Sequence, residues 1–316
     1  MLISNNMKKI LFTCVFVSFI LYACFDPSVV VEASKSGILI WFQQILPALL
    51  PFTIISSVLL KSHFLDSFKG NANIIAIVIT MVCGFVFGFP IGAKLSSDFY
   101  KNKMLTEKQA TILAISTNNF SPMYVCGFAL PLLFRTNQYF TATYALLYLL
   151  PLVLVTTYLI ATYMNESALL HNNASNKQAD SSSIFRLNMQ ILDESIINSF
   201  LSLIKICGYI VFFSIIAHIF TNLWANPPFI LDFILKNLEI SNGISLLSQD
   251  TYSSNIKYVL AIQLLSFGGL SGIAQTASLL ESSKLSTYKY IIGKVILSLF
   301  LTLLSVIYVS YFILQP

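Results

Sequence analysis

The sequence predicts an all-α fold, a polytopic membrane helical bundle. Of the 316 residues, 56% are hydrophobic and 10% are charged, whereas a soluble domain carries about 25% charged residues. Most of the charge-free runs exceed the roughly 20 residues that an α-helix needs to cross a bilayer core. Strands of a membrane β-barrel would alternate in polarity and be about half as long, so helices are expected.

Eight spans are expected where the charge-free runs fall, and lipid is therefore the main partner. They cover residues 9–25, 38–60, 74–93, 110–134, 141–163, 200–221, 257–280 and 290–313. The first span follows Lys8 and Lys9 and is interpreted as an uncleaved span, with a cleaved signal peptide as the alternative. The chain is thus expected to be a multi-pass protein of the cell membrane.

One polar tract, "NESALLHNNASNKQADSSS", divides the chain and predicts a solvated linker over 165–183. It separates a first half, 37–164, from a second half, 184–316, and an N-terminal span with a short loop, 1–36, precedes both. The stretch after the linker, "IFRLNMQILDESIINSF", places apolar residues near one face. It predicts an amphipathic helix at the membrane interface before the next span.

The two halves show the same order of features. Each opens with an aromatic-rich helix, and each then carries a glycine-broken apolar segment that contains Phe-Gly, at 87–88 and at 267–268. Repeated halves with interrupted helices in corresponding places are typical of transporters. We therefore expect two pseudo-repeats containing interrupted or re-entrant helices.

The placement of lysines favours a re-entrant hairpin at the first break. If every segment crossed the membrane from a cytoplasmic amino terminus, Lys101, Lys103 and Lys108 would lie outside, against the usual positive-inside bias. If the segment 84–92 enters and returns, these lysines lie inside and the two halves run in opposite directions. A full crossing remains the alternative.

Several stretches in order along residues 37–281 are similar to a known family. They include "GFVFGFPIGAKLSSDFYKNKMLTEKQATILAISTNNFSPMYVCG", "LIKICGYIVFFSIIAHIF", "NLEISNGISLL" and "SFGGLSGIAQTASLL". The chain resembles the sporulation integral membrane protein family of the YlbJ type, which carries the Gate domain of nucleoside-recognition proteins. The resemblance implies two gate-like halves in a multi-pass membrane protein of endospore-forming bacteria, needed for spore formation. It names no transported species.

The first break supplies the first candidate binding residues, Gly88, Pro90 and Gly92. Proline removes a backbone donor and glycine weakens a helix, so freed backbone groups at membrane depth must face protein or water. Such groups can bind a ligand, or the break can be a kink that packs against a neighbour. Lys94 follows, and it either neutralises an anionic ligand or extends to the interface.

Three further candidates are polar residues in otherwise apolar stretches. Asn118 and Asn119, in "STNNFSP", either offer amide groups to a polar solute or cap the broken helix ends. Glu239, in "LKNLEISNGISLL", either binds a proton or sodium ion at membrane depth or meets water on a surface helix beside Lys236.

The second break, "SFGGLSGIAQ", adds Ser271 and Gln275 to the candidate binding residues. Its glycines either open the backbone or permit close helix packing. We expect the two breaks to face each other and build one polar site at the midplane.

Other classes of site are not expected. The five cysteines show no C-x-x-C or metal-ligand spacing, so no disulfide framework, metal or cofactor is predicted. The net charge of +5 is scattered, which argues against nucleic-acid binding. "GLSG" matches a short motif of intramembrane rhomboid serine proteases, with Ser271 as nucleophile and His218 as base. However, the histidine precedes the serine and nothing else fits, so no catalytic residue or enzyme activity is expected.

The leading hypothesis is a transporter or gate for a small polar solute, with or without a coupling ion, that acts during endospore formation. The alternative is a non-transporting membrane scaffold for spore-envelope assembly, with sporulation membrane partners or further copies of the chain.

Overall fold

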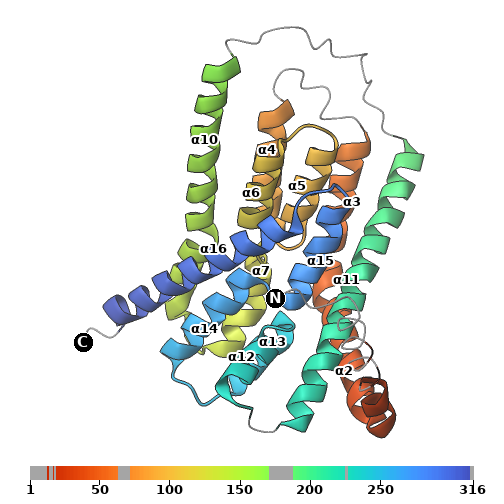
Figure 1. The fold of residues 1–316 in the computed structure, drawn as a ribbon, viewed down its shortest axis with the longest axis vertical. Coiled ribbons are helices and arrows are strands. Elements are labelled where there is room, and N and C mark those ends of the chain that lie inside the picture. Colours follow the sequence, from red (N-terminus) through yellow and green to blue (C-terminus); the bar gives the residue numbers. More distant parts are fainter. Residues whose placement is uncertain are drawn as a thin grey trace.

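The computed structural model describes residues 13, 17, 19–62, 72–170, 188–224 and 227–313, and within these ranges the chain forms helices and no strand (Figure 1). Four described helical stretches are long and apolar enough to cross a membrane: Asn137–Ala161, Met189–Leu223, Ser254–Glu281 and Thr287–Tyr311. The predicted all-α membrane bundle is confirmed. Of the predicted first span, 9–25, the structure describes residues 13, 17 and 19–25, and these are helical.

The first long helix begins earlier than the sequence predicted. α2 (Pro27–Ile40), a π-helical turn η1 (Trp41–Ile45) and α3 (Leu46–Lys61) follow one another directly. The Asp26 carboxylate accepts a hydrogen bond of 3.5 Å from the Val29 amide, and Pro27 occupies the first turn. Aspartate before proline is a strong helix-start signal, so the loop expected before residue 37 is wrong.

The first break is the tip of a helical hairpin. α4 (Ala72–Phe87) and α5 (Ile91–Lys101) pack against each other, and Figure 1 shows them side by side in the upper half of the molecule. Gly88 at the tip has a φ of 73°, a conformation that favours glycine. The stretch 74–93 is therefore two helices joined by a turn and not one continuous helix, and the re-entrant threading stays a prediction.

The predicted span 110–134 is interrupted. α6 (Glu107–Thr117) ends at the asparagine pair, and a second helix follows over residues 122–133, built from α7 (Pro122–Tyr124), η3 (Val125–Ala129) and α8 (Leu130–Leu133). Ser121 caps this second helix by accepting a hydrogen bond of 3.2 Å from the Tyr124 amide, with proline in its first turn.

The long helix that closes the first half reaches into the predicted linker. It consists of η4 (Asn137–Tyr139), α9 (Phe140–Tyr144), η5 (Ala145–Leu149) and α10 (Leu150–Leu170). Residues 165–170 of the linker expected over 165–183 therefore belong to α10, and residues 171–187 lie outside the described part of the chain.

The second half opens with one helix of 35 residues, α11 (Met189–Leu223), capped by Asn188. A separate interfacial helix is wrong for the described residues, since no breaker separates residues 189–199 from the following apolar run. The remaining elements are α12 (Phe229–Lys236), α13 (Ile240–Gln249), α14 (Ser254–Phe267), α15 (Gly269–Glu281), α16 (Thr287–Tyr308) and η6 (Val309–Ile313).

The second break differs in kind from the first. Gly268 and Gly269 have φ values of 88° and 70°, and α15 starts directly after α14, so one stretch long enough to span a membrane is interrupted without reversing. Gly272, expected to belong to this break, lies inside α15. The hairpin of the second half is formed instead by α12 and α13, which the sequence did not predict.

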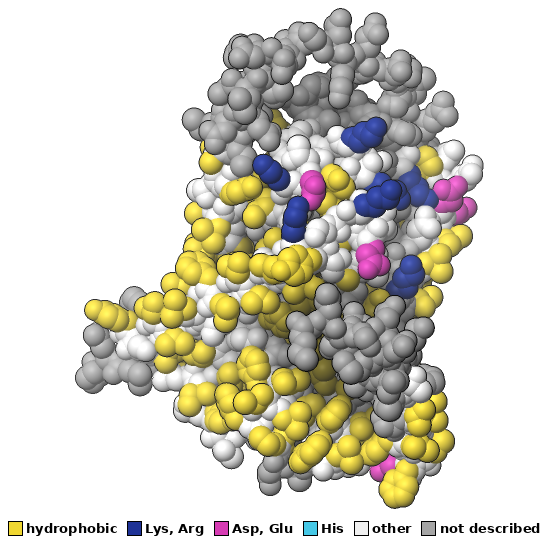
Figure 2. All heavy atoms as spheres, viewed as in Figure 1, with side chains coloured by type: hydrophobic (Ala, Val, Ile, Leu, Met, Phe, Trp, Pro, Cys, Tyr) yellow, Lys and Arg dark blue, Asp and Glu magenta, His cyan; other side chains and the backbone are white. Residues whose placement is uncertain are grey.

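The described elements follow the same order on both sides of residue 180: a long helix, a hairpin, an interrupted helix and a long helix. The α4–α5 hairpin lies in the upper half of Figure 1 and the α12–α13 hairpin in the lower half. Basic side chains gather on the upper half of the molecule in Figure 2, and we name this end the basic end.

Candidate functional site

The tip of each hairpin is bonded to the break in the interrupted helix that follows it. In the first half, the Phe89 amide donates a hydrogen bond of 2.6 Å to the Asn119 carbonyl. A Cβ atom on Gly88 would lie 2.3 Å from the Ser121 amide nitrogen, so the two backbones touch. The tip therefore satisfies a carbonyl that the break would otherwise leave free.

The second half uses the same kind of contact. The amides of Leu270 and Ser271 donate to the carbonyls of Asn237 and Leu238, at 2.7 and 2.9 Å. The first amides of a helix have no partner within that helix, so the hairpin tip serves as the cap of α15. Within the hairpin, a Cβ on Gly243 would lie 2.0 Å from the Lys236 carbonyl oxygen, which leaves room for glycine only.

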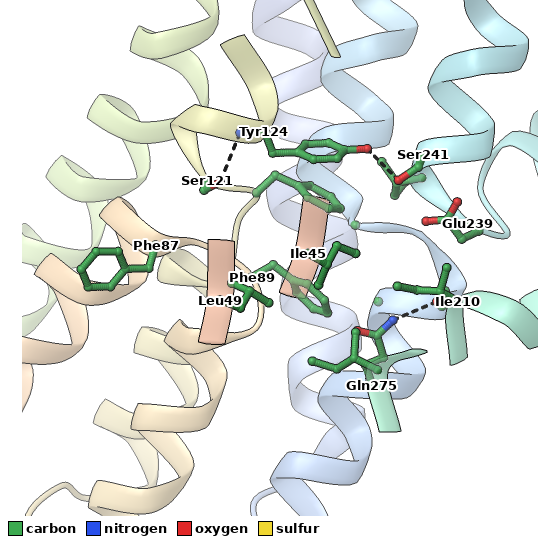
Figure 3. A pocket seen from close by; sticks show the side chains of 16 residues that line it. Ile45, Leu49, Phe87, Phe89, Ser121, Tyr124, Ile210, Glu239, Ser241 and Gln275 are labelled. Carbon is green, nitrogen blue, oxygen red and sulfur yellow. Dashed lines mark hydrogen bonds between the residues drawn. The ribbon is translucent and has the colours of Figure 1, made fainter. Parts of the chain in front are cut away.

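A central cavity of about 60 Å³ lies between these tips and breaks (Figure 3). Its walls are mainly apolar, with rings and aliphatic side chains from the first long helix, the first hairpin tip and α11. Its polar lining side chains are Ser121, Tyr124, Glu239, Ser241, Ser271 and Gln275. Its volume admits only a few water molecules, whereas ligand pockets usually hold about 300–1,000 Å³.

Glu239 lies at the second hairpin tip and lines the central cavity. Its side chain is 5% exposed, so the interpretation of a surface helix meeting water is wrong. The carboxyl group accepts a hydrogen bond of 2.8 Å from the Asn242 amide and caps α13. Lys236 pairs instead with Asp232 and Asp250, and no ion pair involves Glu239 among the described residues.

Gln275 carries an unused acceptor at the cavity. The side chain is 5% exposed, and its Nε2 donates to the Ser271 hydroxyl at 3.0 Å. Its Oε1 has no hydrogen-bond partner within the described part of the chain. A buried acceptor without a partner costs about 1–3 kcal/mol, and such exceptions are expected where a ligand binds.

A second, polar cavity of about 230 Å³ adjoins the first, and we name it the vestibule. Gln275 and Ile206 line both spaces, so these two side chains stand between them. The half-buried Lys94 lines the vestibule together with Asp98 and Lys205.

Of the three candidates at the first break, one lines the vestibule and two allow backbones to pack closely. Pro90 lines the vestibule, while Gly88 and Gly92 line neither cavity. A Cβ on Gly92 would lie 2.7 Å from the Thr117 carbonyl, which shows that this glycine permits close packing.

The asparagine pair lies beside the first break, but its amide groups bind protein atoms. Asn118 donates to Thr276 at 3.0 Å and to the Tyr290 hydroxyl at 2.9 Å. Asn119 donates to the Ser116 carbonyl at 2.8 Å. Neither residue lines the central cavity, so the capping interpretation describes them better than the ligand interpretation.

Sequence reasoning missed three features. The Tyr124 hydroxyl lies 3.0 Å from the Ser241 hydroxyl and links the two halves above the cavity (Figure 3). The Phe89 ring lines the cavity wall. Lys294 is buried inside α16, and a lysine within a predicted span was itself a usable signal.

The proposed protease pair is engaged elsewhere. The Nδ1 atom of His218 lies 2.9 Å from the Ser214 carbonyl, while the Ser271 hydroxyl accepts the Gln275 hydrogen bond. A nucleophile and its base need direct contact, which these bonds do not provide.

Comparison with known proteins gives a partial similarity. The chain is 30% identical over 112 residues to the "Sporulation integral membrane protein YlbJ" of Bacillus subtilis (strain 168), covering 32% of this chain and 27% of that protein. The chain thus matches about a quarter of the length of this relative. No family model and no solved structure matches, so the Gate domain implied by the resemblance stays a prediction.

Proposed function

We propose that this protein is a sporulation protein of the bacterial cell membrane that moves a small polar solute through its central cavity. The observation that carries the proposal is the placement of two hairpins at opposite ends of the bundle, each bonded by its tip to an interrupted helix. Between them lies a cavity with polar groups that their neighbours do not fully occupy. The partial similarity to a sporulation integral membrane protein supports the biological setting.

The order of elements supports inverted gate-like repeats, the arrangement that places a binding site near the midplane of many transporters. In this proposal each hairpin gates one end of the cavity. The basic end faces the cytoplasm by the positive-inside rule, and the vestibule is the cytoplasmic approach.

Three side chains receive roles in the cavity. Ser271 and Gln275 supply hydrogen-bonding groups to the solute, since Oε1 of Gln275 accepts no hydrogen bond from the described residues. Glu239 carries the coupling proton or sodium ion, because a carboxyl group at membrane depth costs roughly 2.5–3.5 kcal/mol and is kept mainly for function.

The test is flux through purified protein in liposomes, with nucleosides, small carboxylate anions and inorganic ions as solutes. We expect uptake of at least one of these classes of solute. Gln275→Leu should abolish this uptake, and the loop variant Thr251→Ala should retain it. Absence of flux and binding for every class, with folded protein, would favour the scaffold. Spore yield separates the two further, because a scaffold tolerates Gln275→Leu.

A further inference from the structure

Lys294 is a buried lysine within α16, a helix long and apolar enough to cross a membrane. Its side chain is 1% exposed and is among the largest fully buried side chains of the described residues. Lys289, on the same helix, lies at the exposed end and pairs with Glu107 at 2.7 Å. Lysines on α16 are therefore not buried in general, and Lys294 is buried because of where it lies on the helix.

The ammonium group of Lys294 is held by neutral oxygens. Its Nζ donates to the Asn118 carbonyl and to Oδ1 of Asn119, both at 2.9 Å. No carboxylate lies within ion-pair distance among the described residues. The other deeply buried lysine, Lys236, sits between two aspartates, which is the usual way to bury a positive charge.

The two oxygens come from the break in the first interrupted helix. Asn118 is the C-cap of α6, where the carbonyls have lost their helical partners and the helix dipole is negative. Carbonyl ends of half-helices at membrane depth are the groups that coordinate cations in transporters. The Asn118 amide is oriented by Thr276 and Tyr290, and Asn119 by the Ser116 carbonyl.

We propose that Lys294 is a tethered cation. Its ammonium group fills an oxygen-lined site at the break between α6 and α7, a site that binds a free monovalent cation of ammonium size, such as potassium, once the side chain is removed. The inference concerns binding and stability, and it does not depend on whether the protein transports a solute.

The test is thermal unfolding of detergent-purified protein in potassium chloride against N-methyl-D-glucamine chloride, an organic cation too large for the site. Wild-type protein should unfold at the same temperature in both salts. Lys294→Ala should be destabilised in the organic salt. Potassium at about tenfold above its dissociation constant should then raise its midpoint by about 3 °C or more.

Three controls define the outcome. Lys294→Met fills the space without a charge and should show no potassium effect, and Lys257→Ala removes a lysine that donates to the Ser248 carbonyl and should show none either. Adding Asn119→Leu to Lys294→Ala should abolish the rescue. The proposal is overturned if Lys294→Ala unfolds at the same temperature in both salts. It is also overturned if potassium changes the unfolding temperature of Lys294→Ala no more than that of Lys294→Met.

Discussion

The Tyr124 hydroxyl and the Ser241 hydroxyl lie 3.0 Å apart, and they join α7 of the first half to α13 of the second across the central cavity. The Tyr124 ring also stacks on Phe120, with centroids 4.8 Å apart. The hydroxyl contact can therefore be removed while the ring keeps its packing.

Tyr124→Phe should weaken the contact between α7 and α13 by about 1 kcal/mol, the usual net value of one hydrogen bond. The measurement is the rate at which a thiol reagent labels Ser271→Cys, in a background without the native cysteines. Labelling should become several-fold faster. Tyr288→Phe, at a residue 72% exposed, is the matched control and should leave the rate unchanged.

Gln275→Leu should leave stability unchanged or raise it while flux is lost, because it removes a buried acceptor that has no partner among the described residues. The measurements are thermal unfolding and liposome uptake on the same preparation. Gln263→Leu is the matched control, since Gln263 Nε2 donates to Asn237 at 3.1 Å and its loss should lower stability. A Gln275→Leu protein as destabilised as Gln263→Leu would assign Gln275 a structural role.

Glu239→Gln should preserve the fold and abolish ion coupling, since a glutamine oxygen can still accept from the Asn242 amide. Glu239→Ala should in addition lose the helix cap, at about 1 kcal/mol. The measurement is uptake driven by a proton or sodium gradient, against exchange without a gradient. Glu194→Gln, an exposed carboxylate at the basic end, is the control that should keep coupling.

Gly243→Ala should destabilise the protein by about 3 kcal/mol or more, because the added methyl group meets a backbone oxygen at 2.0 Å that cannot rotate away. Gly208→Ala in α11 has nothing within 4 Å of the new atom. It should be neutral or stabilising by up to about 1 kcal/mol. Size-exclusion profiles after heating distinguish the two, and equal stability of both variants would contradict the packing of the second hairpin.

Lys101→Cys and Ser282→Cys should be labelled from the same side of the membrane, and Thr251→Cys from the other. Lys101 ends the first hairpin and Ser282 follows the second interrupted helix, both at the basic end, and all three positions are exposed. An impermeant thiol reagent on sealed vesicles makes the measurement. Labelling of Lys101→Cys together with Thr251→Cys would mean that residues 72–101 cross the membrane.

The sequence predicted those features of the fold that depend on composition or on helix-breaking residues. Charge-free length predicted the bundle, the lysines near residue 101 favoured a hairpin at the first break, and Gly268 marked a break. The α12–α13 hairpin was not predicted, because its helices of 8 and 10 residues are too short to give the charge-free run of a membrane span. The partners of Asn118 depend on residues more than 150 positions away, which local patterns cannot indicate.

Among the described residues, Gln275 and Ile206 are the two that line both the vestibule and the central cavity, whereas the opposite face of the cavity is bounded by a hairpin tip fixed through two backbone hydrogen bonds. The two side chains form a small barrier on one side of the cavity, and the hairpin tip forms a larger one on the other, so the two should move at different rates. Rotating side chains takes picoseconds to nanoseconds when space allows, while swinging a paired helix unit takes microseconds to milliseconds. In the transport cycle that we propose, the slower movement is therefore expected at the end of the bundle away from the basic residues.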